Sequence, residues 1–424
     1  MRYIERFLAA AIPSHFIFMR LLHTSDWHLG QSLHNFERAY EHQCFLDWLL
    51  ATIVSERADA LLIAGDIFDN ANPSSASQKQ LYRFLRQAKE RVPHLNLVVI
   101  AGNHDSPGRL EAPGPLLEAH GTRVVGSVQR GADGAIDVGS MVLPLTGAGG
   151  AVEAWCLAVP FLRPGDVPRV EGEGDPYLNG IALLYRQALE LAQARRQPGQ
   201  AIVAMGHCHM VDGQMSNDSE RRIVIGGTEM LPAGIFGADV AYVALGHLHL
   251  AQAVGKQEHI RYCGSPIPLS FAEVGYRHQV LRVDLHGAAV GEIAPIAVPR
   301  AVPLLRVPAR PAPLAEALAE LAALDLPEAP PDQQPLLEVR IRLDAPEPGL
   351  RSRVEAALDG KPVRLAKIET SSAARTASRD DAVMTLDQLD RLKPDDIFRQ
   401  LYQQKFGNDA PADQLSAFAE LMLP

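Results

Sequence analysis

Five clusters of histidine, aspartate and asparagine constrain the fold of this chain more than any other feature of its sequence. Each cluster directly follows a short apolar run with the length and composition of a buried strand. In chain order they are Asp26-x-His28, Gly65-Asp66-x-x-Asp69, Gly102-Asn103-His104-Asp105, Gly206-His207 and Gly246-His247-x-His249. Ligand sites in α/β proteins lie at the carboxyl ends of strands, so the pattern predicts a functional site built from these side chains.

The apolar runs also indicate the fold class. They cover residues 20–25, 59–64, 96–101, 201–205 and 239–245, and the first three alternate with helical stretches near 39–57 and 74–91. Such alternation is typical of βαβ units, whose strands are covered on both faces. We therefore expect an α/β domain in which the glycine before a polar cluster lets the backbone turn sharply.

The texture of the sequence changes near residue 301, where several prolines precede an Ala/Leu-rich helical stretch at 314–324. After a Pro-rich turn, residues 336–343, 350–358 and 363–368 favour a strand, a helix and a strand. We therefore predict a main domain over 19–300 and a small α+β domain over 301–370. A Ser/Ala/Arg/Asp-rich segment at 371–384 is typical of a linker.

Residues 385–424 predict two C-terminal helices. Thr385 and Gln388 fit a capping box, and Pro394 fits the first position of a helix. An apolar stripe then follows, formed by Ile397, Phe398, Leu401, Tyr402 and Phe406, with Leu415, Phe418, Leu421 and Met422 after Pro411. Two alternatives stay open: the helices pack on their own domain, or they dock onto a helix of a partner.

Residues 1–18 are interpreted as an extension without function, with Met19 as the natural start. Their apolar stretch loosely resembles a signal peptide, but Glu5 and Pro13 interrupt that pattern. No apolar run reaches the ~20 residues needed to cross a bilayer, and the four scattered cysteines fit a reducing cytoplasm. A net charge of -10 argues against strong DNA binding by this chain alone.

The side chains of the five clusters fit a pair of divalent metal ions. Carboxylate, imidazole and amide donors suit Mn²⁺, Fe²⁺ or Zn²⁺, and the thiolates of a structural zinc site are missing from the set. A single histidine is more often structural than a ligand, but buried Asp and His are costly unless paired or metal-bound. Two ions need about seven protein ligands with one shared carboxylate, and the sequence offers Asp26, His28, Asp66, Asn103, His207, His247 and His249. The sequence therefore predicts a two-metal phosphoesterase.

The five clusters resemble the motif set of the calcineurin-like metallophosphoesterases. The blocks around them resemble the SbcD family of DNA-repair nuclease subunits, over roughly residues 19–300: LLHTSDWHLG, LLIAGDIFD, VVIAGNHDSPGRL and YVALGHLHLAQ. The resemblance implies a sandwich of β-sheets flanked by helices. It also implies that 301–370 is a DNA-capping domain and that 385–424 binds the coiled coil of an ATPase partner.

The resemblance divides the seven ligands between two ions, with Asp66 bridging. One ion is expected on Asp26, His28, Asp66 and His249, and the other on Asp66, Asn103, His207 and His247. The family expectation for both ions is Mn²⁺. His209 is set aside, because the family pattern needs only the first histidine of the His207-Cys208-His209 segment.

The resemblance also separates the catalytic residues from the ligands. His104 faces the scissile phosphate and could protonate the leaving oxygen, work that suits an imidazole because its pKa lies near neutrality. Asp69 is expected to orient His104. Asp105 is expected to fix the backbone, and the Gly264-Ser265-Pro266 loop to be structural.

The implied activity is ATP-dependent 3′ to 5′ exonuclease on double-stranded DNA ends, with endonuclease on hairpins and single strands, in repair, recombination and replication. The implied assembly is a homodimer within a heterotetramer with an SbcC-type coiled-coil ATPase, in the cytoplasm at the nucleoid. The dimer contact would involve the helix at 74–91. Its stripe of Leu81, Phe84, Leu85 and Ala88 fits either this contact or packing on the sheet.

Two other functions remain open at this point. The first is a calcineurin-like phosphoesterase that acts on nucleotides, phosphoproteins or small diesters; the additional domain and the helical tail disfavour it. The second is a non-catalytic scaffold that keeps the fold as a binding surface. Such a scaffold would be expected to lack some metal ligands, whereas this sequence has the full set.

Overall fold

The computed structural model describes residues 18–170, 172–211, 213–214, 230–343 and 347–371, with Tyr402, Pro411 and Leu415. The chain divides into two compact units, 1–341 with 349–369 and 342–348 with 370–424, and the described residues belong almost entirely to the first. Three predictions lie outside the described residues: the extension before Phe18, the linker beyond Ser371 and, apart from three residues, the C-terminal helices.

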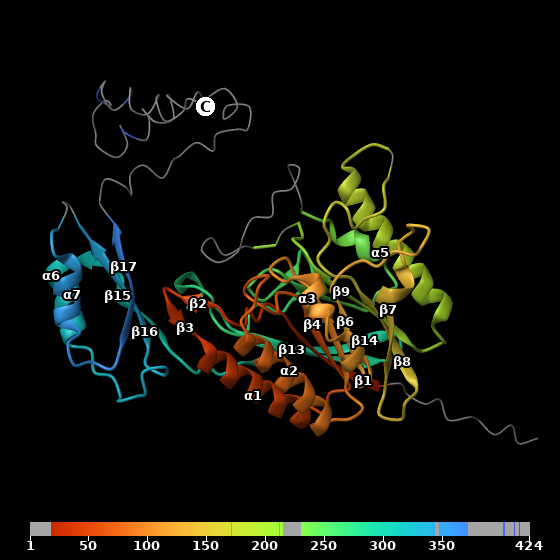
Figure 1. The fold of residues 1–424 in the computed structure, drawn as a ribbon, viewed down its shortest axis with the longest axis horizontal. Coiled ribbons are helices and arrows are strands. Elements are labelled where there is room, and N and C mark those ends of the chain that lie inside the picture. The colour runs from red at the N-terminus through yellow and green to blue at the C-terminus, as the bar shows by residue number, and fades with distance from the viewer. Residues whose placement is uncertain are drawn as a thin grey trace, which may run out of the picture. The chain divides into compact units, whose positions relative to one another are not determined.

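Two six-stranded sheets form the centre of the first unit (Figure 1). In spatial order the first sheet contains β14 (Ala289–Ala297), β13 (Gln279–His286), β1 (Phe18–Thr24), β4 (Ala60–Ala64), β5 (Asn96–Ile100) and β6 (Thr122–Val125). The last four strands run parallel, and β13 and β14 add to β1 in antiparallel fashion. The predicted βαβ arrangement is therefore confirmed.

The second sheet carries the last two polar clusters. In spatial order it contains β11 (Gln252–Val254), β12 (Gln257–Tyr262), β10 (Tyr242–Gly246), β9 (Ala201–His207), β8 (Val152–Ala158) and β7 (Val142–Thr146). The four central strands are parallel, and β7 and β11 are antiparallel edges. Parallel centres bring the carboxyl ends of β9 and β10 to the same edge of this sheet.

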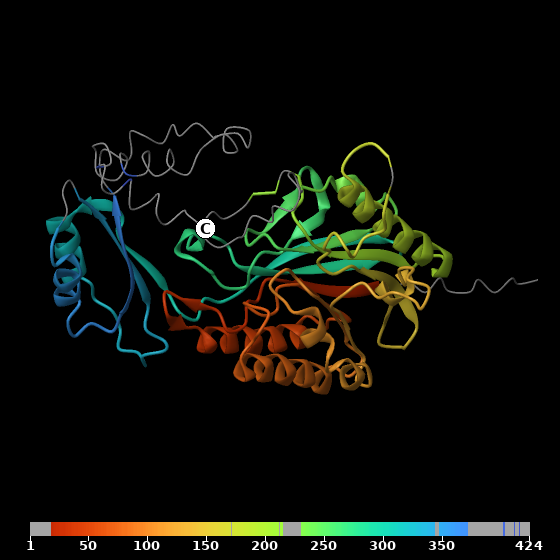
Figure 2. The same ribbon diagram turned by 45° about the horizontal axis from the view of Figure 1, so that its top comes forward.

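Helices cover the outer faces of both sheets (Figures 1 and 2). The helices α1 (Ala39–Ser55) and α2 (Ser75–Arg91) pack on the first sheet, and α5 (Pro176–Arg195) packs on the second. Along β4, Leu62 faces the core between the sheets, whereas Leu61 and Ile63 face the helices. This alternation produces four layers, helix-sheet-sheet-helix, with a strand buried on both faces as predicted.

The stripe on α2 is part of this core. Leu81, Phe84, Leu85 and Ala88 are at most 2% exposed, and the Phe84 ring packs edge-on against Trp27 at 5.3 Å between centroids. Packing on the sheet is therefore the confirmed alternative for these four side chains. A contact between α2 of two chains would have to use the other face of the helix, and it stays a prediction.

A third, three-stranded sheet follows, of order β15-β16-β17 with bounds Leu304–Pro313, Leu336–Arg342 and Arg364–Ser371. It carries α6 (Leu314–Ala322) and α7 (Leu350–Ala357), close to the predicted ranges. The sequence pattern did not predict β15, because its prolines indicate interruption. A strand at the edge of a sheet tolerates prolines, since their missing N–H groups cost no ladder hydrogen bond on the open side.

The remaining elements are short. A hairpin joins β2 (Ser32–Leu33) to β3 (Phe36–Glu37), α3 (Pro107–Glu111) and α4 (Gly114–Glu118) follow β5, and three short 3₁₀ turns are η1 (Val138–Met141), η2 (Ala233–Phe236) and η3 (Phe271–Glu273). Among the described residues, no helix has the length and apolar character needed to cross a membrane.

Candidate metal centre

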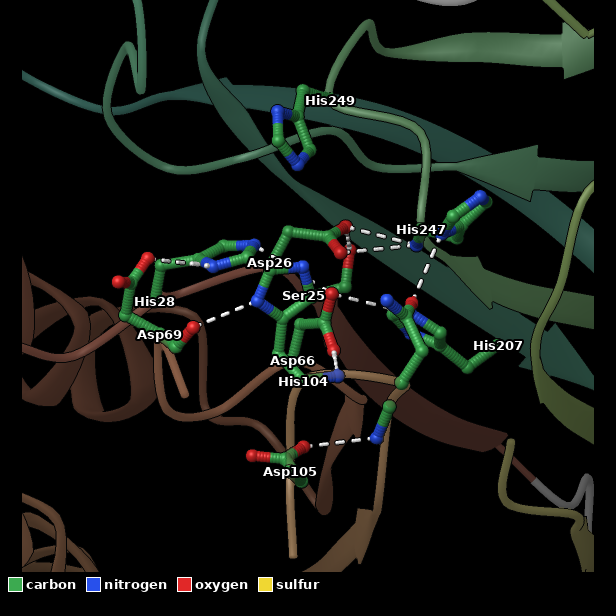
Figure 3. Close-up of polar contacts among 12 residues, drawn as sticks. Ser25, Asp26, His28, Asp66, Asp69, His104, Asp105, His207, His247 and His249 are labelled. Carbon is green, nitrogen blue, oxygen red and sulfur yellow. Dashed lines mark hydrogen bonds and ion pairs between the residues drawn. The ribbon is translucent and has the colours of Figure 1, made fainter. Parts of the chain in front are cut away.

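The predicted clusters meet where strands of the first and second sheets end. Asp26 follows β1, Asp66 follows β4 and Asn103 follows β5, while His207 ends β9 and His247 follows β10. Figure 3 shows these side chains pointing toward one another from both sheets. The strand-end pattern therefore predicted the place of the site.

The backbone at this site is strained. Asp26, His28, Asp66 and His247 have φ values of 53°, 47°, 49° and 104°, in the region that favours glycine. Such a conformation costs of order 1–3 kcal/mol per residue and persists where neighbouring structure enforces it. Here the main-chain N–H of Asp26 donates to Gly65 at 3.0 Å, and that of His28 donates to Asp66 at 3.0 Å. Strain at four of the seven predicted ligands indicates that function, and not packing alone, keeps this backbone.

Three glycines let the strand ends come this close. A Cβ atom on Gly246 would lie 1.9 Å from the carbonyl oxygen of Ala64, and one on Gly102 would lie 2.3 Å from the main-chain nitrogen of Asp66. A Cβ atom on Gly65 would lie 2.3 Å from His207 Nδ1. At these positions only a residue without a side chain fits.

We expect Gly246→Ala to lower both stability and activity. The new methyl group must displace β4 or β10, an overpacking that costs about 1–3 kcal/mol, and a shift of the ligands by about 1 Å can lower the rate by about 10²-fold. Urea denaturation and the rate of phosphodiester hydrolysis measure the two effects. Gly234→Ala in η2 is the matched control, because its Cβ meets nothing within 4 Å. Wild-type stability and rate in Gly246→Ala would contradict this packing.

The first set of ligands lies between β1 and the segment after β10. One ligand atom each of Asp26, His28 and His249 comes within 4.8 Å of the other two. Asp66 Oδ2 lies 3.6 Å from His28 Nε2, so this carboxylate adjoins the same set. These four side chains could hold one divalent ion, in the combination that the resemblance implies.

The second set lies between β5 and the second sheet. His207 Nε2 lies 3.0 Å from Asn103 Oδ1, and His247 Nδ1 lies 3.2 Å from the same oxygen. His207 Nε2 also lies 3.4 Å from Asp66 Oδ2. These donors converge as the ligands of one ion would.

Asp66 has the geometry of a bridging ligand. Its Oδ1 accepts a hydrogen bond of 2.8 Å from the main-chain N–H of His104. Its Oδ2 lies within 3.6 Å of an imidazole from each set, His28 and His207. One oxygen is therefore anchored to the protein, and the other is placed between the two sets.

The charge balance of the site favours bound cations. Asp26 and Asp66 are at most 2% exposed, and no lysine or arginine of the described residues pairs with either. Burial raises the pKa of Asp26. Burial also acts to raise the pKa of Asp66, but His207 and His28 outweigh it and hold that pKa well below its usual range. In turn Asp66 outweighs the burial of His207 and raises its pKa to about 9. The carboxylates thus attract positive charge, which a divalent ion would supply in place of a proton.

Hydrogen bonds to the outer ring nitrogen orient two of the histidines. His207 Nδ1 lies 2.9 Å from the carbonyl oxygen of Ala64, and His28 Nδ1 lies 3.3 Å from Asp69 Oδ1. Metal-binding histidines commonly donate one ring N–H in this way, which fixes the tautomer and turns the other nitrogen to the ion. The arrangement therefore leaves Nε2 of both rings to act as the metal donor.

Glu273 plays the same part for His249, and the sequence analysis did not identify it. Its Oε1 lies 2.9 Å from His249 Nδ1, and its Oε2 accepts a hydrogen bond of 2.7 Å from the main-chain N–H of Leu269. The residue is fully buried at the end of η3. The signal available in sequence was one acidic residue in an otherwise uncharged stretch, 264–275.

We expect Glu273→Ala to weaken metal binding by roughly 10–100-fold, the usual effect of removing a partner that orients a metal ligand. Glu273→Gln should weaken it less, because its amide oxygen can still accept the His249 N–H. Isothermal titration of metal into metal-free protein measures the affinity. Glu292→Ala, which removes an exposed carboxylate paired with Arg282, is the control. Equal affinities of Glu273→Ala and wild type would refute the assigned role.

His104 lies beside the first set of ligands. Its ring centroid is 4.8 Å from that of His28, and its Nδ1 lies 2.7 Å from the carbonyl oxygen of Asp69. Asp69 thus contacts His104 through its main chain, whereas its carboxylate contacts His28. Ligand atoms of His28, Asp69 and His104 also come within 4.8 Å of one another. Because Asp69 already contacts the Nδ1 atoms of both rings, we interpret this group as one that orients the rings, and the catalytic roles of His104 and Asp69 stay predictions.

Asp105 fixes the backbone, as expected. Its carboxylate accepts hydrogen bonds from the main-chain N–H groups of Ile67, Phe68 and Gly102 at 3.1, 3.0 and 2.8 Å. Burial raises its pKa to about 6, with the charge of Asp66 adding to the effect. These bonds connect the loop after β4 to the loop after β5.

His209 lies next to the second set but outside the groups that could hold an ion. Its ring centroid is 6.2 Å from that of His247, and no cluster of metal-binding side chains among the described residues contains it. This placement agrees with setting His209 aside as a ligand.

Comparisons with known proteins agree with this geometry. Residues 19–251 match the family model described as calcineurin-like phosphoesterase. Residues 300–406 match the model SbcD_C, described as type 5 capsule protein repressor C-terminal domain. A solved dimetal phosphatase from Danio rerio covers 67% of this chain and all of its own, but a TM-score of 0.33 at 11% identity supports no inference.

Three curated relatives share one name, which makes each the SbcD component of the nuclease SbcCD. The Rhodobacter capsulatus protein is 38% identical over 385 residues, which are 90% of this chain and 93% of the relative. The Escherichia coli K12 protein is 34% identical over 366 residues, 84% and 86% of the two chains. The Bacillus subtilis protein is 35% identical over 268 residues, 63% and 66% of the two chains.

Proposed function

The chain belongs to the SbcD family of nuclease subunits with a calcineurin-like phosphoesterase domain, and on this premise we propose that it cleaves DNA phosphodiester bonds with two divalent ions. One observation carries the proposal: Asp66 Oδ2 lies 3.6 Å from His28 Nε2 and 3.4 Å from His207 Nε2, between two sets of ligands. The family membership disfavours a phosphatase of nucleotides or phosphoproteins, and the full ligand set disfavours a non-catalytic scaffold.

The residues of the chain have distinct parts in this proposal. Asp26, His28, Asp66 and His249 hold one ion, and the second is held by Asp66, Asn103, His207 and His247. The ion pair, when bound, supplies Lewis-acid chemistry to the phosphoryl group. The Asp69 carbonyl fixes the tautomer of His104 through Nδ1, and we assign to His104 Nε2 the transfer of a proton to the leaving sugar oxygen.

We propose Mn²⁺ as the metal, because a mixed set of carboxylate, amide and imidazole donors suits it. Metal-free protein reloaded with Mn²⁺, Mg²⁺, Fe²⁺ or Zn²⁺ in separate samples tests this choice. The highest rate of hydrolysis is expected with Mn²⁺. A higher rate with any of the other three ions would contradict it.

We further propose a coiled-coil ATPase as the partner, with the nuclease as a homodimer in a heterotetramer at the nucleoid. The name of the relatives, which makes each one component of a nuclease called SbcCD, supports such a complex. Residues 301–370 would cap the DNA, and residues 385–424 would bind the coiled coil. The net charge of -10 fits this division, since the partner would supply much of the DNA affinity. Deletion of 385–424 should abolish co-purification with the ATPase, and retained binding would contradict the assignment.

The substrate is tested by comparing DNA with small phosphoesters. End-labelled duplex, hairpin and single-stranded DNA are incubated with Mn²⁺, with and without the ATPase partner and ATP. We expect 3′ to 5′ shortening of duplex ends that depends on ATP, and internal cuts in hairpins and single strands. Faster turnover of nucleotides or phosphopeptides than of every DNA substrate would contradict the proposal.

A further inference from the structure

A hollow of about 500 Å³ lies beside the second set of metal ligands. It is bounded by the segment after β8, the first two turns of α5 and the end of β9. His207 belongs to both places: its Nε2 faces Asn103, and its ring also lines the hollow. The volume falls within the ~300–1,000 Å³ typical of small-molecule sites, so the hollow can take a group attached to whatever the ions bind.

The walls of the hollow are apolar and aromatic. No lysine, arginine, aspartate or glutamate is among its lining residues in the described part of the chain. The side chains that give it this character are Phe161, Leu162, Tyr177, Leu178, Ile181 and Tyr185. A phosphate or another charged group would lose its hydration here without a partner. The occupant that fits is therefore uncharged and able to pack against aromatic rings.

The walls are held in place before any ligand enters. The main-chain N–H of Phe161 donates to the carbonyl oxygen of Ala101 at 2.8 Å, which fixes this segment beside the loop that carries Asn103. The Tyr177 hydroxyl donates to the carbonyl oxygen of Leu162 at 2.6 Å. The Phe161 ring also packs edge-on against His207, with 6.3 Å between centroids. The hollow and the metal ligands thus form one connected structure.

We propose that this hollow receives the base of the nucleotide whose phosphate lies at the metal centre. The inference rests on the proposed DNA substrate, since within one nucleotide the sugar places the base next to the phosphate. Bases stack on aromatic side chains regardless of sequence, which suits a nuclease without a sequence preference. A base paired in a duplex must leave its stack to enter. Single strands, hairpin loops and frayed ends are therefore cleaved more readily than the interior of a duplex.

The test compares cleavage with and without a base at one position. Two end-labelled single strands differ only there: one carries a normal nucleotide and the other an abasic tetrahydrofuran residue. With Mn²⁺ and the wild-type chain, cleavage at that position should be at least about fivefold faster when the base is present, the lower end of the range for base–aromatic stacking.

Two variants on α5 locate the effect. Leu178→Trp fills the mouth of the hollow, and the ratio of the two rates should fall toward one. Leu183→Phe, on the same helix but not among the lining residues, is the matched control and should keep the wild-type ratio. Metal content, measured on each preparation, separates filling of the hollow from loss of ions.

The outcomes distinguish this inference from the proposed function. Equal cleavage of both strands by wild type overturns the inference while DNA cleavage itself stands. An unchanged ratio in Leu178→Trp with two ions bound also overturns it, because the base would then be held elsewhere. If neither strand is cut while nucleotides or phosphopeptides are hydrolysed, the proposed function fails, and the inference fails with it.

Discussion

Replacing His104 with asparagine is expected to lower the rate of DNA cleavage by roughly 10²–10⁴-fold, the usual contribution of a general acid, while both metal ions stay bound. The asparagine amide can still donate to the Asp69 carbonyl that now bonds to His104 Nδ1. Its side chain ends before the position of Nε2 and has no proton to transfer near neutral pH. The main-chain N–H that bonds to Asp66 is unchanged, so the bridging carboxylate keeps its anchor.

The leaving group makes this prediction sharper. A p-nitrophenyl ester of thymidine phosphate has a leaving oxygen that needs little protonation, so His104→Asn should hydrolyse it at nearly the wild-type rate. Rates on this ester and on DNA, measured with metal content on the same preparations, test the assignment. If His104→Asn keeps wild-type DNA cleavage, or loses both activities equally, His104 is not the general acid.

Replacing Asp66 with asparagine is expected to remove both activity and metal. The neutral amide cannot balance two ions, and no other carboxylate lies between His28 and His207 among the described residues. The loss of metal affinity should exceed the roughly 10–100-fold expected for Glu273→Ala, since Asp66 binds the ions directly. Dialysed protein should therefore contain fewer than two ions per chain by elemental analysis, with DNA cleavage at background.

A matched control separates this effect from the general cost of neutralising a buried carboxylate. Asp284 is 5% exposed and pairs with Arg20 at 2.7 Å, where β13 pairs with the first half of β1, away from the Asp26 end of that strand. Asp284→Asn should lose stability but keep two ions per chain. Two ions in Asp66→Asn would mean that Asp66 does not bridge.

The strands that carry ligands could be predicted because each joins an apolar run to a polar cluster. In β4, all five residues are buried and Gly65-Asp66 follows at once, so local sequence contains the whole signal. The strand β15 is different. Its prolines are acceptable only because it lies at the edge of its sheet, and neighbours in a sheet are set by tertiary structure.

The same distinction applies to the site. His23 and His28 are close in sequence and both are buried. Yet His23 bonds to Tyr242 at 2.8 Å and Leu245 at 3.1 Å across the two sheets, as a structural histidine. The D-x-H spacing separated the two in advance. Glu273 belongs to no such spacing, and its contact with His249 depends on how a distant loop folds back, so sequence alone did not identify it.

The most direct test of the account is an anomalous difference map of crystals grown with Mn²⁺, recorded at the manganese absorption edge. The account predicts two peaks about 3.5–4 Å apart, one beside His28 and His249 and the other beside His207 and His247, with Asp66 Oδ2 between them. A single peak, or a pair that Asp66 does not contact, would contradict it.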